Sequence, residues 1–144
     1  MIRTAIAAAA VTAAIALTAL PASAAGISIQ QWGWGNAAGG HQTGWNNTVG
    51  VFQNGNFNEM VGQQFGNHNT VAVGQDGWHN YADIDQNGNG NAGGVGQFGS
   101  HHQAVITQDG NGNIVAGVQV GNGCDANVSQ NGGGNVAAFV QACP

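Results

Sequence analysis

The chain has 144 residues, enough for one modest domain, and almost no charge: one Lys or Arg, six Asp or Glu, and a net charge of −5. So few cations cannot neutralise phosphates, which excludes nucleic-acid binding. So few charges are also typical neither of an ordinary soluble surface nor of charged disorder, and polar low-complexity disorder stays open at this point.

Residues 1–24 predict a secretory signal peptide. Arg3 gives a basic start, an Ala-rich apolar run extends from Ala5 to Leu20, and Ala22-Ser23-Ala24 forms a small-residue cleavage site. A membrane anchor is the alternative, but the run is short for a span and poor in large apolar residues. We expect cleavage after Ala24, which leaves a secreted chain without Lys or Arg in surroundings that permit disulfides.

From Gln31 onward the sequence repeats every eleven residues. Gln opens each unit, the first ten Gln have a Gly two residues later, and eight of these ten have an Asn five residues later. His102 and Cys124 stand in place of Asn in the other two units. Ten units run without insertion or deletion from Gln31 to Val140, and a stub begins at Gln141. A period this regular is not typical of disorder and predicts a repeat architecture.

The pattern within a unit alternates like a β-strand. Positions 8 and 10, counted from the Gln, are mostly small or apolar, as in Val71 and Val73. The recurring Asn, the two apolar residues, the next Gln and its Gly thus fall at every second place, which predicts a strand of about nine residues. Positions 4 and 5 hold pairs such as Asn89-Gly90, which suit a tight turn.

Two consecutive units can form a 22-residue coil with the recurring residues facing inward. Coils stacked about 4.8 Å apart give an all-β fold, a β-solenoid of five coils built from ten strand-turn units. Each residue then lies over the residue 22 positions earlier, so inward Gln and Asn stack on their own kind. Amides stacked in this way donate to one neighbour and accept from the other, which satisfies polar groups that are costly to bury.

The residues predicted to form these ladders, and the glycines predicted to let neighbouring corners approach closely, follow directly from the repeat. The ladder residues are Gln42, Gln53, Gln64, Gln75, Gln86, Gln97, Gln108, Gln119, Gln130, Asn47, Asn58, Asn69, Asn80, Asn91, Asn113 and Asn135. The turn glycines are Gly44, Gly55, Gly66, Gly77, Gly88, Gly99, Gly110, Gly121 and Gly132.

The two cysteines fall where coils meet. Cys124 takes the inward place of an Asn, and Cys143 takes the place of a Gly beside the same corner, one coil further on. The two thiols are therefore expected to meet and to form a disulfide at the C-terminal end of the solenoid. Two free or buried thiols are the alternative.

The motif Gln-x-Gly-x-x-Asn-x-Ala, as in residues 75–82, resembles the curlin repeat of bacterial curli fibres, and the resemblance covers residues 31–141. It implies a subunit that leaves a Gram-negative-type bacterium through a dedicated outer-membrane export pore. It also implies self-assembly, together with other curlin subunits, into extracellular amyloid fibres that adhere to host or abiotic surfaces and form biofilm matrix. Residues 25–41 resemble the Gly-rich segment that this export machinery recognises and overlap the first unit, and residues 42–144 are expected to be the amyloid domain.

The ends of the predicted solenoid favour assembly. Natural sheets protect exposed edges with Lys, Pro, bulges or a covering helix. Residues 25–144 contain no Lys, and their only Pro is Pro144. We therefore expect molecule to stack on molecule in a cross-β arrangement. Whether the chain grows such a fibre or nucleates it stays open.

Other functions fit the sequence less well. A monomeric secreted solenoid, such as an adhesin or an ice-binding protein, is the main alternative. Ice binding favours a regular Thr face, and Thr43, Thr48, Thr70 and Thr107 are not expected to align. Calcium-binding β-rolls have nine-residue repeats with Asp in every turn, whereas this period is eleven and Asp is sparse.

The sequence contains no Ser-His-Asp set, paired-carboxylate cleft or phosphate loop, so we expect neither an enzyme nor a cofactor. His79 and His101 occupy the same turn position in successive coils and are expected to stack. A metal site at these histidines is a weaker alternative.

Overall fold

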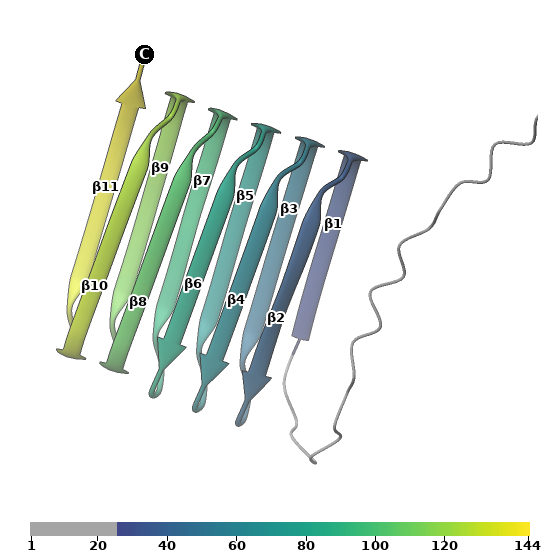
Figure 1. Ribbon diagram of the computed structural model, residues 1–144. Coiled ribbons are helices and arrows are strands. Elements are labelled where there is room, and N and C mark those ends of the chain that lie inside the picture. Colours follow the sequence, from purple (N-terminus) through teal and green to yellow (C-terminus); the bar gives the residue numbers. More distant parts are fainter. Residues whose placement is uncertain (1–25) are drawn as a thin grey trace, which may run out of the picture.

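The computed structural model describes residues 26–144, and the predicted signal peptide lies outside these residues. Eleven strands follow one another along the described chain (Figure 1). They are β1 (Gly26–Trp34), β2 (Ala37–Thr43), β3 (Thr48–Asn56), β4 (Glu59–Phe65), β5 (Thr70–Trp78), β6 (Tyr81–Asn87), β7 (Ala92–Ser100), β8 (Gln103–Asn111), β9 (Ile114–Asn122), β10 (Asp125–Gly133) and β11 (Val136–Cys143). Over this part of the chain, no helix is long and apolar enough to cross a membrane.

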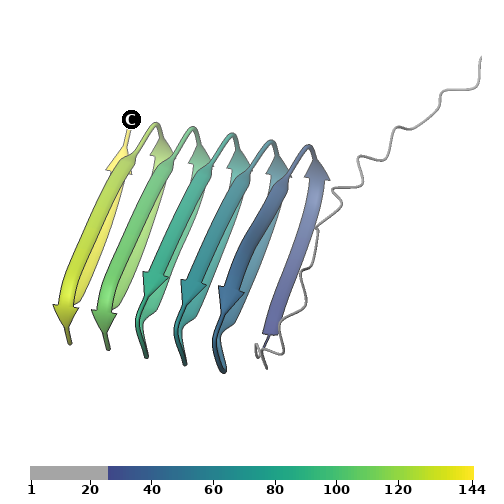
Figure 2. The same ribbon diagram turned by 60° about the horizontal axis from the view of Figure 1, so that its bottom comes forward.

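The strands form two parallel sheets that face each other (Figure 2). The odd-numbered strands make a six-stranded sheet in the order β1-β3-β5-β7-β9-β11, and the even-numbered strands make a five-stranded sheet in the order β10-β8-β6-β4-β2. Each residue pairs with the one 22 positions away, for example Val49 with Val71 and Gln75 with Gln97. This confirms the predicted β-solenoid with 22-residue coils, and β1 adds one strand before the first predicted unit.

The corners differ in detail from the prediction. The residue at position 6 was expected to start a strand, but Asn47, Asn58 and their equivalents lie in the corner, and the strands begin one residue later. Position 5 is the cause, because it adopts a left-handed backbone even where it is not Gly, with φ of 56° at Phe57 and 54° at His79. This residue turns the chain sharply, and the next side chain points inward from the corner itself.

The interior combines the polar ladders with an apolar core from positions 8 and 10. The core residues are Val49, Val51, Met60, Val71, Val73, Ala82, Ile84, Val95, Ala104, Ile106 and Val115. Large and small residues compensate for each other within it: a Cβ on Gly62 would lie 2.8 Å from the Met60 Cε, so Met60 fills the space that Gly62 leaves open. At this place a large and a small residue fill the interior together.

The two outward faces differ in chemistry. Glu59, Asp83, Asp85, Asp109 and Asp125 all lie on strands of the five-stranded sheet, and Asp76 alone lies on the six-stranded sheet. The outward positions of the six-stranded sheet hold mainly small and apolar residues, such as Ala72, Gly94, Ala116, Phe52 and Phe98. Negative charge is therefore concentrated on one side of the solenoid.

One prediction about the outer face is wrong. Thr48 and Thr70 do align, as direct partners in β3 and β5, because they occupy the same place in successive coils. Thr43 and Thr107 lie on the five-stranded sheet, at different positions along β2 and β8. The aligned Thr therefore make one pair and no extended face.

Candidate functional site

The Gln side chains form two continuous ladders inside the solenoid. In each ladder, the Nε2 of one Gln donates to the Oε1 of the Gln 22 positions further on, at 2.6 to 2.9 Å. One ladder runs through the six-stranded sheet from Gln31 to Gln141, and the other runs through the five-stranded sheet from Gln42 to Gln130. The middle members are buried, with 1% or less of their surface exposed.

The same Gln side chains also connect the two sheets. The second N–H of Gln53 donates to the carbonyl of Ala37 at 2.9 Å, and that of Gln75 donates to Glu59 at 2.9 Å. Every ladder Gln from Gln53 to Gln141 repeats this bond to the residue 16 positions earlier, which belongs to the opposite sheet. From Gln53 to Gln119 both amide protons are thus satisfied, and a shorter or apolar residue could not replace the whole set of bonds.

The Asn side chains hold the corners. The Nδ2 of Asn69 donates to the carbonyl of Gly88 at 2.8 Å, and its Oδ1 accepts from the backbone N–H of Asn91 at 3.0 Å. The equivalent bonds recur at Asn47, Asn58, Asn80, Asn91 and Asn113. Because each Asn bonds to the coil that follows it, hydrogen bonds connect successive corners as well as successive strands.

His102 reproduces the bonds of the Asn that it replaces. Its backbone N–H donates to the Oδ1 of Asn80 at 3.1 Å, its Nδ1 accepts from the N–H of Cys124 at 3.1 Å, and its Nε2 lies 3.2 Å from the carbonyl of Phe98. An Nδ1 that accepts and an Nε2 that donates specify the neutral Nε2–H tautomer. The sequence analysis identified His102 only as an exception to the Asn pattern and did not predict this role. The imidazole ring, like the Asn amide, carries one acceptor and one donor, and this similarity could have suggested it.

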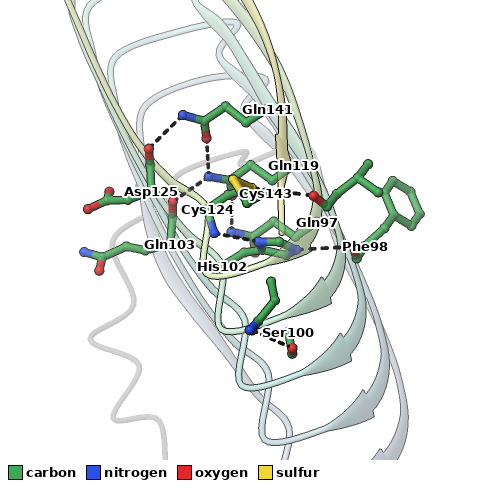
Figure 3. Close-up of a disulfide and its surroundings, with 12 residues drawn as sticks. Gln97, Phe98, Ser100, His102, Gln103, Gln119, Cys124, Asp125, Gln141 and Cys143 are labelled. Carbon is green, nitrogen blue, oxygen red and sulfur yellow. Dashed lines mark hydrogen bonds between the residues drawn. A yellow bond between two sulfur atoms is a disulfide. The ribbon is translucent and has the colours of Figure 1, made fainter.

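Cys124 and Cys143 form a disulfide, with their Cα atoms 5.6 Å apart (Figure 3). Cys124 ends the corner ladder that begins at Asn36, and Cys143 lies on β11, beside Gly121 of β9. Among the described residues there is no free cysteine. The bond attaches the last strand covalently to the corner that precedes β10.

The turn glycines allow neighbouring corners to touch. Gly77 has a φ of 132°, and a Cβ built on it would overlap the carbonyl oxygen of Gly99 in the next coil. The same close approach recurs from Gly44 to Gly121, with each glycine facing the residue 22 positions later. Gly132 differs, since its φ is 100° but a Cβ would meet only the Asn135 side chain, at 3.9 Å.

Aromatic rings stack along one outer corner. The ring centroids of Phe57 and His79 are 5.1 Å apart, and those of His79 and His101 are 5.2 Å apart with an interplanar angle of 2°. This is the stacking predicted for His79 and His101. In the described part of the chain, no group of three or more His, Cys, Asp or Glu side chains could hold a metal ion.

The acids on β6 are held in unfavourable surroundings. Burial raises the pKa of the Asp85 carboxyl, and the neighbouring negative charge of Asp83 raises it further. Burial likewise raises the pKa of Tyr81, followed by the charges of Asp83 and Glu59. One carboxylate oxygen of Asp83 and one of Asp85 are buried without a hydrogen-bond partner. This part of the outer face therefore disfavours negative charge.

The Gln ladder of the five-stranded sheet has unused hydrogen-bonding groups at both of its ends. The Oε1 of Gln42 is buried and has no hydrogen-bond partner. At the other end, Gln130 donates to Ile114 and accepts from Gln108, which leaves one of its amide protons directed beyond the last coil. Both ends are thus shaped to continue the same pattern.

A model of the curlin associated repeat matches residues 44–77 and 80–110. This chain is a curlin-family repeat protein. The family is one of structural proteins, extracellular fibre subunits of bacteria, and the β-solenoid of this curlin-family chain fits such a subunit. No curated protein matches the chain.

Proposed function

We propose that this curlin-family chain is a structural subunit of an extracellular, curli-type amyloid fibre that serves cell adhesion and biofilm matrix formation. The subunit is exported behind its signal peptide, with residues 25–41 as the segment that the outer-membrane export machinery recognises. It then adds to the end of a fibre by self-templated stacking, alone or with other curlin subunits. It carries out no catalysis and needs no cofactor.

The observation that carries the proposal is the continuity of the ladders up to both ends. Each Gln and Asn makes the same hydrogen bonds with the next coil that its equivalent in the previous coil makes with it. A second copy can therefore extend the pattern with the hydrogen bonds that already hold the coils together. In the described residues, no Lys or helix covers either end strand, which leaves both ends open to pairing.

Seeded assembly of residues 25–144 tests the proposal. The chain is diluted from denaturant, and thioflavin fluorescence is followed with and without preformed seeds. We expect a lag phase that seeds abolish, and fibres with a reflection at about 4.7–4.8 Å. A β-rich monomer that stays soluble and never responds to seeds would contradict the fibre function and favour a monomeric secreted solenoid.

A further inference from the structure

The eleven strands cannot be stacked head to tail without a conflict at the junction. Both outermost strands, β1 and β11, belong to the six-stranded sheet, so the five-stranded sheet ends one strand short on each side. If β11 of one copy paired with β1 of the next, β10 and the next copy's β2 would lie two strand spacings apart, about 9.6 Å. This gap is too wide for backbone hydrogen bonds, and it would break the Gln ladder of that sheet.

β1 and β11 are equivalent half-coils in the repeat. Ten units separate Gln31 from Gln141, and Ile29 from Phe139. We propose that in the fibre β11 of one copy takes the place of β1 in the next copy, pairs with that copy's β3, and displaces β1 from the solenoid. This inference rests on the proposed fibre function and specifies how its subunits join.

The exchange completes the five-stranded sheet. With β11 in the place of the next copy's β1, β10 lies one spacing from that copy's β2, and Gln130 precedes Gln42 by one coil. The remaining amide proton of Gln130 then reaches the buried Oε1 of Gln42, which has no partner within the described chain. Asn135, the last member of its corner ladder, meets the backbone N–H of Asn47 in the same way.

Gly132 is shaped for the same junction. It keeps the left-handed φ of the other turn glycines, here 100°, although no later coil of its own chain lies against it. In the exchanged arrangement, the carbonyl of the next copy's Gly44 comes to lie over it, as Gly132 itself lies over Gly110. If β1 stayed in place, Gly132 would face the gap between β10 and the next copy's β2, and no carbonyl would lie close enough to require a glycine there.

β11 is held more firmly than β1, which decides which strand is displaced. The Cys124–Cys143 disulfide ties β11 to its own solenoid (Figure 3). The Phe139 ring occupies the space over Gly117, where a Cβ would overlap it. In β1, by contrast, the inward residues Ile27 and Ile29 are 58% and 43% exposed. The N-terminal strand is therefore the weaker occupant of the shared place.

Three substitutions in the mature chain test the exchange by seeded elongation rate. Gly132→Ala should slow elongation about tenfold, because the added methyl meets the next copy's carbonyl. Gly134→Ala is the matched control, since Gly134 also has a left-handed φ, 69°, but no close contact, and it should elongate within about twofold of the parent chain. Ile29→Asp should elongate as fast as the parent chain or faster, because the strand it weakens has to leave.

Two measurements on fibres of the unmodified chain complete the test. Amide hydrogens of residues 26–34 should exchange rapidly while those of residues 136–143 are protected. The axial rise per subunit, obtained from mass per length, should be about 24 Å for five spacings, against about 29 Å if β1 is retained. Seedable fibres with protected β1 amides, a six-spacing rise, or elongation slowed by Ile29→Asp and not by Gly132→Ala would overturn the exchange alone. A chain that forms no seedable fibre would instead overturn the proposed function.

Discussion

The inside and the outside of the solenoid follow opposite rules, although both are built from the same strands. Inward positions repeat the same Gln, Asn and Gly in nearly every coil, and they are tied by bonds between residues 22 positions apart. Outward positions on the same strands change freely, as in the outward series Asn54, Asp76 and Phe98 of the six-stranded sheet. The repeat is therefore maintained by stacking geometry, and the outer face is available for charge and for contacts with other molecules.

The sharpest contrast between inside and outside lies on one strand, β5. Gly77→Ala should destabilise the solenoid by about 4 kcal/mol, because a Cβ overlaps the Gly99 carbonyl and the left-handed φ disfavours Ala. Gly74→Ala should leave stability nearly unchanged, since its Cβ would meet nothing within 4 Å. Urea unfolding of dilute monomer, followed by circular dichroism, measures both. If the two substitutions changed stability equally, the close contact between Gly77 and the next coil would not be what requires a glycine at this corner.

Removing one Gln from a ladder should cost somewhat less. Gln86→Leu leaves the Gln64 amide, the Gln108 Oε1 and the Thr70 carbonyl without their partners, so we expect a loss of about 2 to 3 kcal/mol. Gln103→Leu, an exposed Gln on the outward side of β8, is the control and should change stability by less than about 0.5 kcal/mol. Urea midpoints of the two variants give the comparison. A loss below about 1 kcal/mol for Gln86→Leu would mean that the ladder contributes little.

His102 and His101 are adjacent in sequence but lie inside and outside the corner. His102→Ala should cost about 1 to 2 kcal/mol, because the N–H of Cys124 loses its acceptor and a cavity forms. His102→Asn should restore most of this stability by restoring the corner ladder. His101→Ala removes only an exposed stacked ring and should have a small effect. If Asn at position 102 were as destabilising as Ala, His102 would not be acting as a substitute for Asn.

The smallest effect should come from the outer acids on β6. The pKa of Asp85 is raised by burial and then by Asp83, so its ionised form destabilises the fold above the folded pKa, and stability rises as the pH falls through that value. Asp85→Asn should flatten this part of the pH profile, and Asp83→Asn should flatten it less because burial is the larger cause. Unfolding midpoints between pH 3 and 7 measure the change. A profile that is unaltered in Asp85→Asn would show that another group is responsible.

Much of the architecture could be predicted from particular residues. The spacing of Gln53, Gln75 and Gln97 predicted the coil length, and the alternation in residues such as Val71 and Val73 predicted the strand. The predicted start of the strands at Asn58 and its equivalents was wrong by one residue. The cause is the left-handed backbone at position 5, which the corner imposes whether the residue is Phe57, His68 or Gly90. Because the residue type varies there, the sequence does not indicate this conformation. The number of strands on each sheet did not follow from the repeat, because the repeat begins at Gln31 and the alternating residues Ile27 and Ile29 of β1 stand before its first complete unit.

The sequence by itself determined a repeat of one half-coil, since a strict eleven-residue phase with alternating inward positions fixes where each strand and turn falls. Its motif Gln-x-Gly-x-x-Asn-x-Ala also carried the resemblance to the curlin family, which the family model matches. Only the tertiary structure decided which side carries the acids, that His102 bonds as an Asn does, and that β1 and β11 end the same sheet. These features depend on residues that are one or more coils apart in the chain. They arise from contacts between coils, and such contacts cannot be predicted from a local pattern in the sequence.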